Sequence, residues 1–223
     1  MRKGKKNSNI LKVSKKNKKE LIKEEEIKNI NKIEYNKVIL MYEYALKTLR
    51  TKLEILNDQF KEICDYNPID HINYRIKSPK SIVNKMNKKN LEINNINMVD
   101  NINDIAGIRI VCSFKNDVYQ IVDILKSYQD IEIIKEKDYI KNPKTSGYQS
   151  YHMIVNVPVV IIDKIVYVKV EIQIRSLAMD FWASLEHKLK YKGSVSQKDS
   201  LQLVKCANVI SKVDDKMQLI KER

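Results

Sequence analysis

The feature that most constrains the fold is a long run of apolar residues at helical spacing between about Ile30 and Cys64. They recur every three or four positions, at Val38, Tyr42, Ala45, Leu46, Leu49, Leu53, Leu56, Phe60 and Ile63. This period predicts one long amphipathic helix, whose apolar stripe needs a second layer of structure to cover it. Asn67-Pro68 ends the pattern, because the residue before a proline is disfavoured in the helical conformation.

Helical and strand patterns alternate along the rest of the chain. Helical spacing predicts helices that start at Pro79 and that span residues 117–127, 177–189 and 201–219. Apolar, β-branched or alternating residues predict strands at 105–114, about 131–135, 150–157 and 165–175, and residues 137–148 are expected to form a loop. No repeat is visible, so the fold class is expected to be α/β or α+β.

Much of the positive charge lies at the N-terminus. The chain has 42 basic and 28 acidic residues, and ten basic residues but one acidic residue fall in residues 1–23. Blocks of like charge repel and stay solvated, so residues 1–29 are predicted to be a disordered tail and residues 30–223 the folded domain. The tail could bind RNA or another anionic surface weakly, or it could simply continue the Lys-, Asn- and Ile-rich composition of the chain.

Cysteine usage and hydropathy exclude several classes of protein. Cys64, Cys112 and Cys206 are widely spaced and form no CxxC, which argues against a disulfide framework and against a zinc site. No apolar stretch approaches the length of a membrane-spanning helix, and the N-terminus lacks the apolar core of a signal peptide. The expectation is a cytoplasmic protein without a membrane partner.

The segment around Glu171 carries the clearest chemical signal. Alternation places Lys169, Glu171, Gln173 and Arg175 on one face of a strand, while the apolar residues between them occupy the other face. The polar face could be the solvated outside of an antiparallel sheet, or it could be the floor of a binding cleft.

A second carboxylate, Asp104, stands at the start of the buried strand that contains Arg109. An arginine inside an apolar strand is costly unless an anion meets it. Strict alternation would put Asp104 and Arg109 on opposite faces, so Gly107 is interpreted as a β-bulge that reconciles them. Gly107 and Gly147 are either ordinary turn glycines or points where the backbone approaches a ligand closely.

Two basic clusters accompany these carboxylates. Arg75, Lys77, Ser81 and Lys85 precede and enter the helix that starts at Pro79, and residues 141–152 combine lysines, small hydroxyls and tyrosines. Either cluster alone could be a solvated surface, but together they suit phosphates and the face of a base. Two carboxylates beside phosphates typically hold Mg²⁺, which favours phosphoryl or nucleotidyl transfer. P-loop, GxGxxG, kinase and His-Asp signatures are absent.

The ordered motifs resemble those of one enzyme family. They are Arg75-Ile-Lys77-Ser-Pro-Lys-Ser81, Asp104-Ile-Ala-Gly-Ile-Arg109, the segment from Asp138 to His152, Glu171-Ile-Gln-Ile-Arg175, and the segment from Met179 to Lys192. This series resembles the small alarmone synthetases, single-domain members of the RelA/SpoT family, over about residues 40–215 with a motif core at 75–192. The resemblance implies a nucleotidyltransferase-like mixed sheet flanked by helices.

The same resemblance implies an activity. It is the Mg²⁺-dependent transfer of the β,γ-pyrophosphate of ATP to the ribose 3′-hydroxyl of GDP or GTP, which releases AMP and makes (p)ppGpp for the stress response. Synthetase-only members carry no hydrolase domain and generally form homotetramers, and the heptad-like helix at 30–64 could supply apolar contact area for that assembly.

Residue roles follow from the matched motifs. Asp104 and Glu171 are the implied catalytic residues and Mg²⁺ ligands. The positions implied to bind ATP are Arg75, Lys77, Ser81, Lys85 and Arg109. The positions implied to bind the guanosine acceptor are Lys144, Ser146, Tyr148, His152, Gln173 and Asp180.

Some positions differ from those of relatives, and other functions remain open. Ser146, Gln149 and Asp180 stand where some members carry other residues, which leaves the preference among GMP, GDP and GTP open. A different nucleotidyltransferase would share the cleft, but its Gly-Ser turn and paired acidic residues are not found. A non-catalytic RNA-binding module would explain the basic tail and Tyr148, but it would not need Asp104 and Glu171.

Overall fold

The computed structural model describes residues 32–192 and 196–223, so the expected tail at 1–29 lies outside the described residues. Within them, five strands form one sheet in the order β1-β2-β5-β4-β3. The strands are β1 (Ile69–Ile76), β2 (Ala106–Cys112), β3 (Glu132–Asp138), β4 (Tyr151–Ile161) and β5 (Lys164–Ser176). β2 and β5 are parallel and the other neighbours are antiparallel, so the sheet is mixed, which confirms the expected class.

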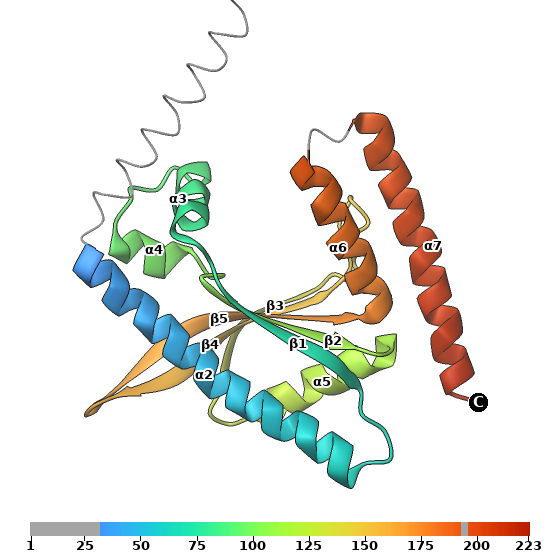
Figure 1. The fold of residues 1–223 in the computed structure, drawn as a ribbon, viewed down its shortest axis with the longest axis horizontal. Coiled ribbons are helices and arrows are strands. Elements are labelled where there is room, and N and C mark those ends of the chain that lie inside the picture. Colours follow the sequence, from blue (N-terminus) through green and yellow to red (C-terminus); the bar gives the residue numbers. More distant parts are fainter. Residues whose placement is uncertain (1–31, 193–195) are drawn as a thin grey trace, which may run out of the picture.

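The helices lie on both sides of this sheet. They are α2 (Lys32–Ile63), α3 (Pro79–Lys88), α4 (Asn95–Asn101), α5 (Lys115–Ser127), α6 (Leu177–Lys192) and α7 (Gln197–Lys221). In Figure 1, α2 and α5 lie on one side, whereas the pairs α3–α4 and α6–α7 stand on the other side, near opposite ends of the strands. One sheet face is therefore covered by α2 and α5, and the other is flanked by two helical pairs.

The apolar stripe of α2 forms much of the core. Ala45, Leu49 and Leu53 have no exposed surface, and α2 packs against β1, β2, β4 and β5. A fully buried leucine of this kind contributes roughly 1.5–3 kcal/mol. The interpretation of this heptad-like stripe as contact area for a homotetramer is therefore wrong, because the stripe is used within the chain.

Two elements had no clear signal in the sequence. Polar residues interrupt the alternation of β1, which lies at one edge of the sheet. α4 has seven residues and is capped by Asn94, whose side chain accepts a hydrogen bond from Asn97 N at 2.8 Å. The other expected elements are present with shifted ends. β3 runs to Asp138, so the loop expected at 137–148 begins later than predicted.

None of the helices in the described ranges is long and apolar enough to cross a membrane.

Candidate active site

The uncovered face of the sheet carries the polar side chains that the sequence singled out. Gln173 is paired in register with Arg109 of β2 on one side and with His152 of β4 on the other. Along β5, Val170, Ile172 and Ile174 alternate with these polar residues, point to the opposite face of the sheet and are buried. A pocket of about 370 Å³ lies over β1, β2 and β5, and its lining includes Arg75, Arg109, Glu171 and Gln173. The structure thus supports the cleft-floor interpretation of this face over the solvated one.

Gly107 lets Arg75 approach Glu171 across β2. In the register, Gly107 lies between Arg75 of β1 and Glu171 of β5. A Cβ at this position would lie 3.3 Å from Arg75 Nε, which is tighter than ordinary contact. Arg75 Nη2 reaches to 4.0 Å from Glu171 Oε2. The β-bulge expected at Gly107 is wrong, because β2 pairs with both neighbours without a register shift at Gly107 and Asp104 precedes the strand.

Asp104 is held between two lysines, and we call Lys77, Asp104 and Lys85 the lysine cluster. Lys77 Nζ lies 2.8 Å from Asp104 Oδ2, and Lys85 Nζ, from α3, lies 2.8 Å from Oδ1. Burial alone would raise the pKa of Asp104, but the two ammonium groups outweigh it and hold the pKa below its usual value. Asp104 is therefore ionised at neutral pH.

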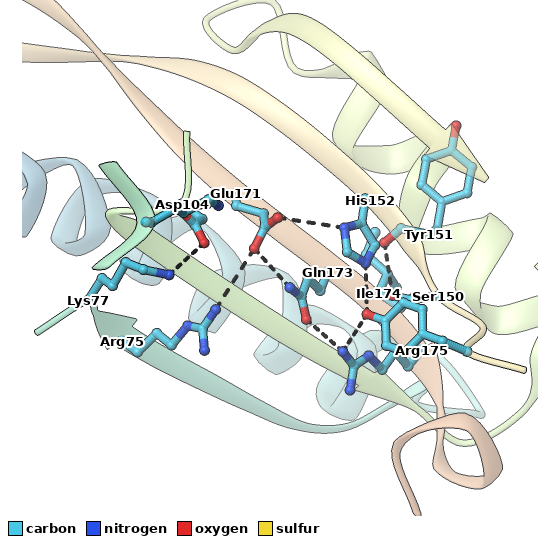
Figure 2. Close-up of polar contacts among 12 residues, drawn as sticks. Arg75, Lys77, Asp104, Ser150, Tyr151, His152, Glu171, Gln173, Ile174 and Arg175 are labelled. Carbon is cyan, nitrogen blue, oxygen red and sulfur yellow. Dashed lines mark hydrogen bonds and ion pairs between the residues drawn. The ribbon is translucent and has the colours of Figure 1, made fainter. Parts of the chain in front are cut away.

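Glu171 has a different set of neighbours. Gln173 Nε2 donates a hydrogen bond to Glu171 Oε2 at 2.8 Å, and His152 Nδ1 lies 3.6 Å from Oε1 (Figure 2). Burial opposes ionisation of Glu171, but the interaction with His152, followed by that with Gln173, leaves its pKa below the usual value. The nearby charge of Asp104 acts in the opposite direction, which indicates that the two carboxylates feel each other.

Aromatic side chains gather on the other side of Glu171. The Tyr148 and His152 rings meet edge to face at 5.7 Å, and Tyr139 packs in the same way on Tyr148 at 6.2 Å and on His152 at 5.2 Å. Lys144 Nζ lies 4.7 Å from the Tyr148 ring centre and 4.5 Å from that of Tyr139. This is an aromatic surface with a cation beside it, as the base and phosphates of a nucleotide require.

The loop that carries Tyr148 depends on Gly147. Its backbone has φ +87°, a left-handed conformation that favours glycine, and a Cβ would lie 2.5 Å from Ala207 Cβ on α7. Gly147 N donates to Lys144 O at 2.8 Å, and Lys144 N donates to Tyr148 O at 3.1 Å. The turn therefore places Tyr148 and Lys144 together while the loop packs against α7.

Asp180, near the start of α6, joins two arginines. Its Oδ1 lies 3.1 Å from Arg175 Nη1 and 3.4 Å from Arg109 Nη1. Burial, followed by the repulsion from Arg175, lowers the pKa of Arg109, and Asp180 partly offsets both effects. Asp180 thus neutralises part of the charge of two neighbouring arginines.

Two expected site residues lie apart from these groups. Ser81 is exposed in the first turn of α3, where its Oγ lies 2.9 Å from Ser78 Oγ. Ser146 lines a separate pocket of about 640 Å³ between its loop and α6 and α7, with Glu186 and Lys190 among the neighbours. The remaining expected residues are the ones that the structure brings together on or beside the sheet face.

Arg175 and Tyr139 contact the site, but neither was predicted as a catalytic or binding residue, and Arg175 was predicted only to lie on the polar face of its strand. Arg175 continues the alternation of β5, so its direction was readable, but its burial among site residues was not. Tyr139 lies within the segment from Asp138 to His152 that resembles the family motif. Its place in that segment was the one sequence feature that could have identified it as a site residue.

The donors present fit a hard divalent cation. Asp104 and Glu171 are both ionised and close enough to interact, and carboxylate oxygens are the ligands that Mg²⁺ prefers. No cluster of three or more His, Cys, Asp or Glu ligands occurs among the residues described. An ion here would therefore complete its shell with water and with phosphate oxygens of a nucleotide.

A mixed sheet with two ionised carboxylates, phosphate-suited cations and an aromatic surface on one face defines a nucleotide-dependent phosphoryl- or pyrophosphoryl-transfer enzyme. The family profile described as "Region found in RelA / SpoT proteins" matches residues 74–196. The chain belongs to the RelA/SpoT family, which confirms the expectation from the ordered motifs.

Individual relatives agree with this assignment. GTP pyrophosphokinase YwaC of Bacillus subtilis is 46% identical over 186 residues, covering 82% of this chain and 89% of the relative. The crystal structure of small alarmone synthetase 1 from Bacillus subtilis bound to its product pppGpp matches with a TM-score of 0.79 and 33% identity, over 85% of this chain and 97% of that one. Small alarmone synthetase 2 from the same organism matches with a TM-score of 0.77 and 43% identity, over 85% and 98%.

Proposed function

We propose that this chain synthesises (p)ppGpp by transferring the β,γ-pyrophosphate of ATP to the ribose 3′-hydroxyl of GDP or GTP, with GMP as a further acceptor to be tested. The observation that carries the proposal is that two ionised carboxylates share one sheet face: Asp104 is paired with Lys77 and Lys85, and Glu171 is linked through His152 to the aromatic surface of Tyr148. The pppGpp bound in the relative's crystal structure supports it, since that nucleotide is the product of such a transfer to GTP.

The ATP side of the site comprises Arg75, Lys77, Ser81, Lys85 and Arg109. Arg75 and Arg109 border the same pocket, and their flat guanidinium groups suit the two faces of an adenine ring. Lys77 and Lys85 are paired with Asp104 at 2.8 Å, and both can turn to phosphates without leaving a buried charge, because their side chains are 18% and 37% exposed. Ser81 shares α3 with Lys85 and would reach the phosphates from the start of that helix.

Asp104 and Glu171 are the residues that would hold Mg²⁺. When bound, the ion would neutralise phosphate charge and make the β-phosphorus more susceptible to attack. As ATP brings its phosphates and the ion, the two lysines exchange Asp104 for phosphate oxygens, so the charge around Asp104 stays balanced.

Glu171 accepts the proton of the 3′-hydroxyl. The hydroxyl oxygen forms a bond to the β-phosphorus, the bond from that phosphorus to the α,β-bridging oxygen breaks, and AMP leaves with the bridging oxygen. Its low pKa keeps Glu171 deprotonated and ready at neutral pH. Gln173 and His152 hold the carboxylate from both of its oxygens, which fixes its direction.

The acceptor side comprises Lys144, Ser146, Tyr148, His152, Gln173 and Asp180. Tyr148 would stack on guanine, and Lys144 beside the ring would meet the acceptor phosphates. Ser146 points to a neighbouring pocket and would contact the acceptor through its outer phosphates.

Self-association and location complete the proposal. α6 exposes Leu177, Phe181, Leu185 and Leu189 at four-residue spacing, and α7 exposes Val209, Val213 and Met217 in the same way. These exposed stripes of α6 and α7, and not the buried stripe of α2, would be the contact surfaces of a homotetramer. The enzyme would act in the cytoplasm, where its nucleotide substrates occur. The basic tail would add weak RNA or anionic contact.

A labelled-transfer assay tests the proposal. Purified protein is incubated with Mg²⁺, γ-labelled ATP and each of GMP, GDP and GTP, and the nucleotides are separated. We expect the label to appear in guanosine tetra- and pentaphosphate, together with an equimolar amount of AMP. The Glu171→Gln variant should form no labelled product. Absence of transfer by folded protein that binds ATP would contradict the proposal. RNA binding retained by both Glu171→Gln and Asp104→Asn would then favour the RNA-binding alternative.

A further inference from the structure

Arg175, at the end of β5, is almost fully buried and yet directed at the acceptor side of the site. Its residue surface is 4% exposed. Nη2 donates to Tyr148 Oη at 2.6 Å and to Gln173 Oε1 at 2.7 Å, and Nη1 lies 3.1 Å from Asp180 Oδ1. The guanidinium carbon also lies 5.0 Å from the centre of the Tyr148 ring. Neutralising a buried arginine needs one carboxylate, but this one has two further short hydrogen bonds, both to site residues.

These contacts belong to a closed circuit of five side chains, which we call the side-chain ring: Glu171, Gln173, Arg175, Tyr148 and His152. Figure 2 shows the links from His152 to Glu171, from Glu171 to Gln173 and from Gln173 to Arg175. Glu171 is bonded to Gln173 at 2.8 Å, Gln173 to Arg175 at 2.7 Å and Arg175 to Tyr148 at 2.6 Å. Tyr148 Oη lies 2.8 Å from His152 Nε2, and His152 Nδ1 returns to Glu171 at 3.6 Å. The ring therefore connects the carboxylate to the aromatic surface by two routes.

The chemistry of the charged members sets the direction of the bonds. Arginine has only donors and an ionised carboxylate has only acceptors, so the Gln173 amide must turn its oxygen to Arg175 and its NH₂ to Glu171. Tyr148 Oη accepts from Arg175, which leaves the hydroxyl proton free to be donated to His152 Nε2. A neutral His152 would then carry its proton on Nδ1, on the side of Glu171. In this arrangement every hydrogen bond of the side-chain ring has one donor and one acceptor.

We propose that Arg175 is a positioning residue that fixes the spacing between Tyr148 and Glu171. The inference rests on the proposed function, in which Tyr148 stacks on guanine and Glu171 receives the 3′-hydroxyl proton. One guanidinium nitrogen holds the hydroxyl of Tyr148 and, through Gln173, the carboxylate of Glu171. A guanosine nucleotide stacked on Tyr148 then presents its ribose at a set distance from Glu171, and small errors in that distance are expensive for catalysis.

Two conservative variants and their combination test this role. Tyr148→Phe keeps the stacking ring and removes the hydroxyl, while Arg175→Lys keeps the charge opposite Asp180 and loses the two-pronged guanidinium. We expect kcat to fall about 10-fold in Tyr148→Phe and about 100-fold in Arg175→Lys. KM for ATP and for the guanosine acceptor should change less than threefold. The double variant should lose no more than Arg175→Lys, because both changes break the same connection.

The controls separate positioning from folding. Arg50→Lys changes an exposed arginine of α2 that pairs with Glu54, and it should leave kcat unchanged. Unchanged kcat per folded molecule in Tyr148→Phe and Arg175→Lys, or losses that multiply in the double variant, would overturn the inference. A rise in the KM for the acceptor without a fall in kcat would also overturn the inference, because it would mean that Arg175 binds the acceptor directly. If the unaltered protein transfers no pyrophosphate, the proposed function itself fails, whereas an active protein with multiplying losses removes the inference alone.

Discussion

The lysine cluster and the side-chain ring are neighbours on one sheet face, but they are built in different ways. Asp104 meets two long lysine side chains through ion pairs, and one of them is more than a third exposed. Glu171 belongs to a circuit of four short hydrogen bonds and one 3.6 Å contact with His152, in which Arg175 is nearly inaccessible. Long lysine side chains can exchange one ion-pair partner for another, whereas side chains joined to each other by several hydrogen bonds are held more rigidly.

The difference suits the two substrates. When the donor nucleotide binds, the divalent cation can replace the lysines as the partner of Asp104, and the phosphates can replace Asp104 as the partner of the lysines. The lysine cluster is therefore expected to rearrange on binding of ATP. The acceptor hydroxyl, in contrast, needs one carboxylate at one distance, and the ring supplies that arrangement before any substrate binds. The effect of variants on the donor side should therefore depend on the ATP or Mg²⁺ concentration, whereas variants of the side-chain ring should lower kcat.

The largest effect is expected at Glu171. Glu171→Gln keeps the shape and the position beside Gln173 but removes the proton acceptor and the charge, so kcat should fall by about 10³-fold or more. Steady-state assays of guanosine 3′-pyrophosphate formation measure it. Glu132→Gln, on the edge strand β3 and bonded to Asn156, is the matched control and should retain full activity. More than a tenth of the original kcat in folded Glu171→Gln would show that the ring does not surround the reacting carboxylate.

Asp104→Asn should be the next most damaging change. It removes one oxygen ligand for Mg²⁺ and both lysine ion pairs, and activity at saturating ATP should fall by about 100-fold. Higher Mg²⁺ should restore part of the loss, which a titration of initial rate against free Mg²⁺ would measure. Asp130→Asn, a half-exposed partner of Lys52, serves as control. A loss that is the same at every Mg²⁺ concentration would argue that Asp104 serves the fold and not the ion.

Gly107→Ala tests the path of Arg75 across β2. The added methyl would lie 3.3 Å from Arg75 Nε and 3.5 Å from its Cγ, so the arginine must shift. We expect KM for ATP to rise about 5- to 10-fold with little change in acceptor KM, consistent with the loss of one favourable contact of about 1 kcal/mol. An equal rise in both KM values would mean that the two sides of the site are not separable in this way.

The smallest effect concerns Asp214 of α7, which anchors the end of β5. Asp214 is buried, accepts a hydrogen bond from Ser176 Oγ at 2.6 Å, and has a pKa raised by burial. A raised pKa in the folded state means that stability is greatest when the group is protonated and is lost as the pH rises through that pKa. Asp214→Asn should therefore raise Tm by about 2–4 °C at pH 7.5 and have no effect near pH 3.5.

Thermal melts at the two pH values measure this change, and activity should stay the same. Asp215→Asn is the matched control, because Asp215 is exposed and paired with Lys115. A lower Tm in Asp214→Asn at pH 7.5 would mean that the charge of Asp214 is required for its contact with Ser176 at the end of β5.

The residue pattern of a single strand was enough to predict which site residues of β5 share one face of the sheet. A period of two is enough to place Glu171, Gln173 and Arg175 on one face, whatever surrounds the strand. The period of α2 likewise predicted its apolar stripe, but a stripe does not say whether a sheet or another subunit covers it. That choice depends on tertiary structure, and the oligomer interpretation failed there.

The side-chain ring could not be predicted because it depends on register and on a loop. His152 reaches Glu171 only because β4 pairs with β5 so that His152 lies opposite Gln173. Tyr148 reaches Arg175 only because the turn at Gly147 packs on α7. These relations join residues that are 19 or more positions apart in the sequence. Asp104 lies before the first residue of β2, so the alternation of side chains along the strand does not apply to it. No bulge is therefore needed to bring Asp104 and Arg109 to the same site.

The most direct test of the central claim is to establish which bond of ATP breaks. ³¹P NMR of a reaction with Mg²⁺, ATP and GDP would follow the phosphorus signals of substrates and products. We expect equal amounts of AMP and of a new pyrophosphate group coupled to the ribose H3′ of the guanosine nucleotide, with no free pyrophosphate. Free pyrophosphate together with an adenylylated product would contradict it and identify a nucleotidyltransferase instead.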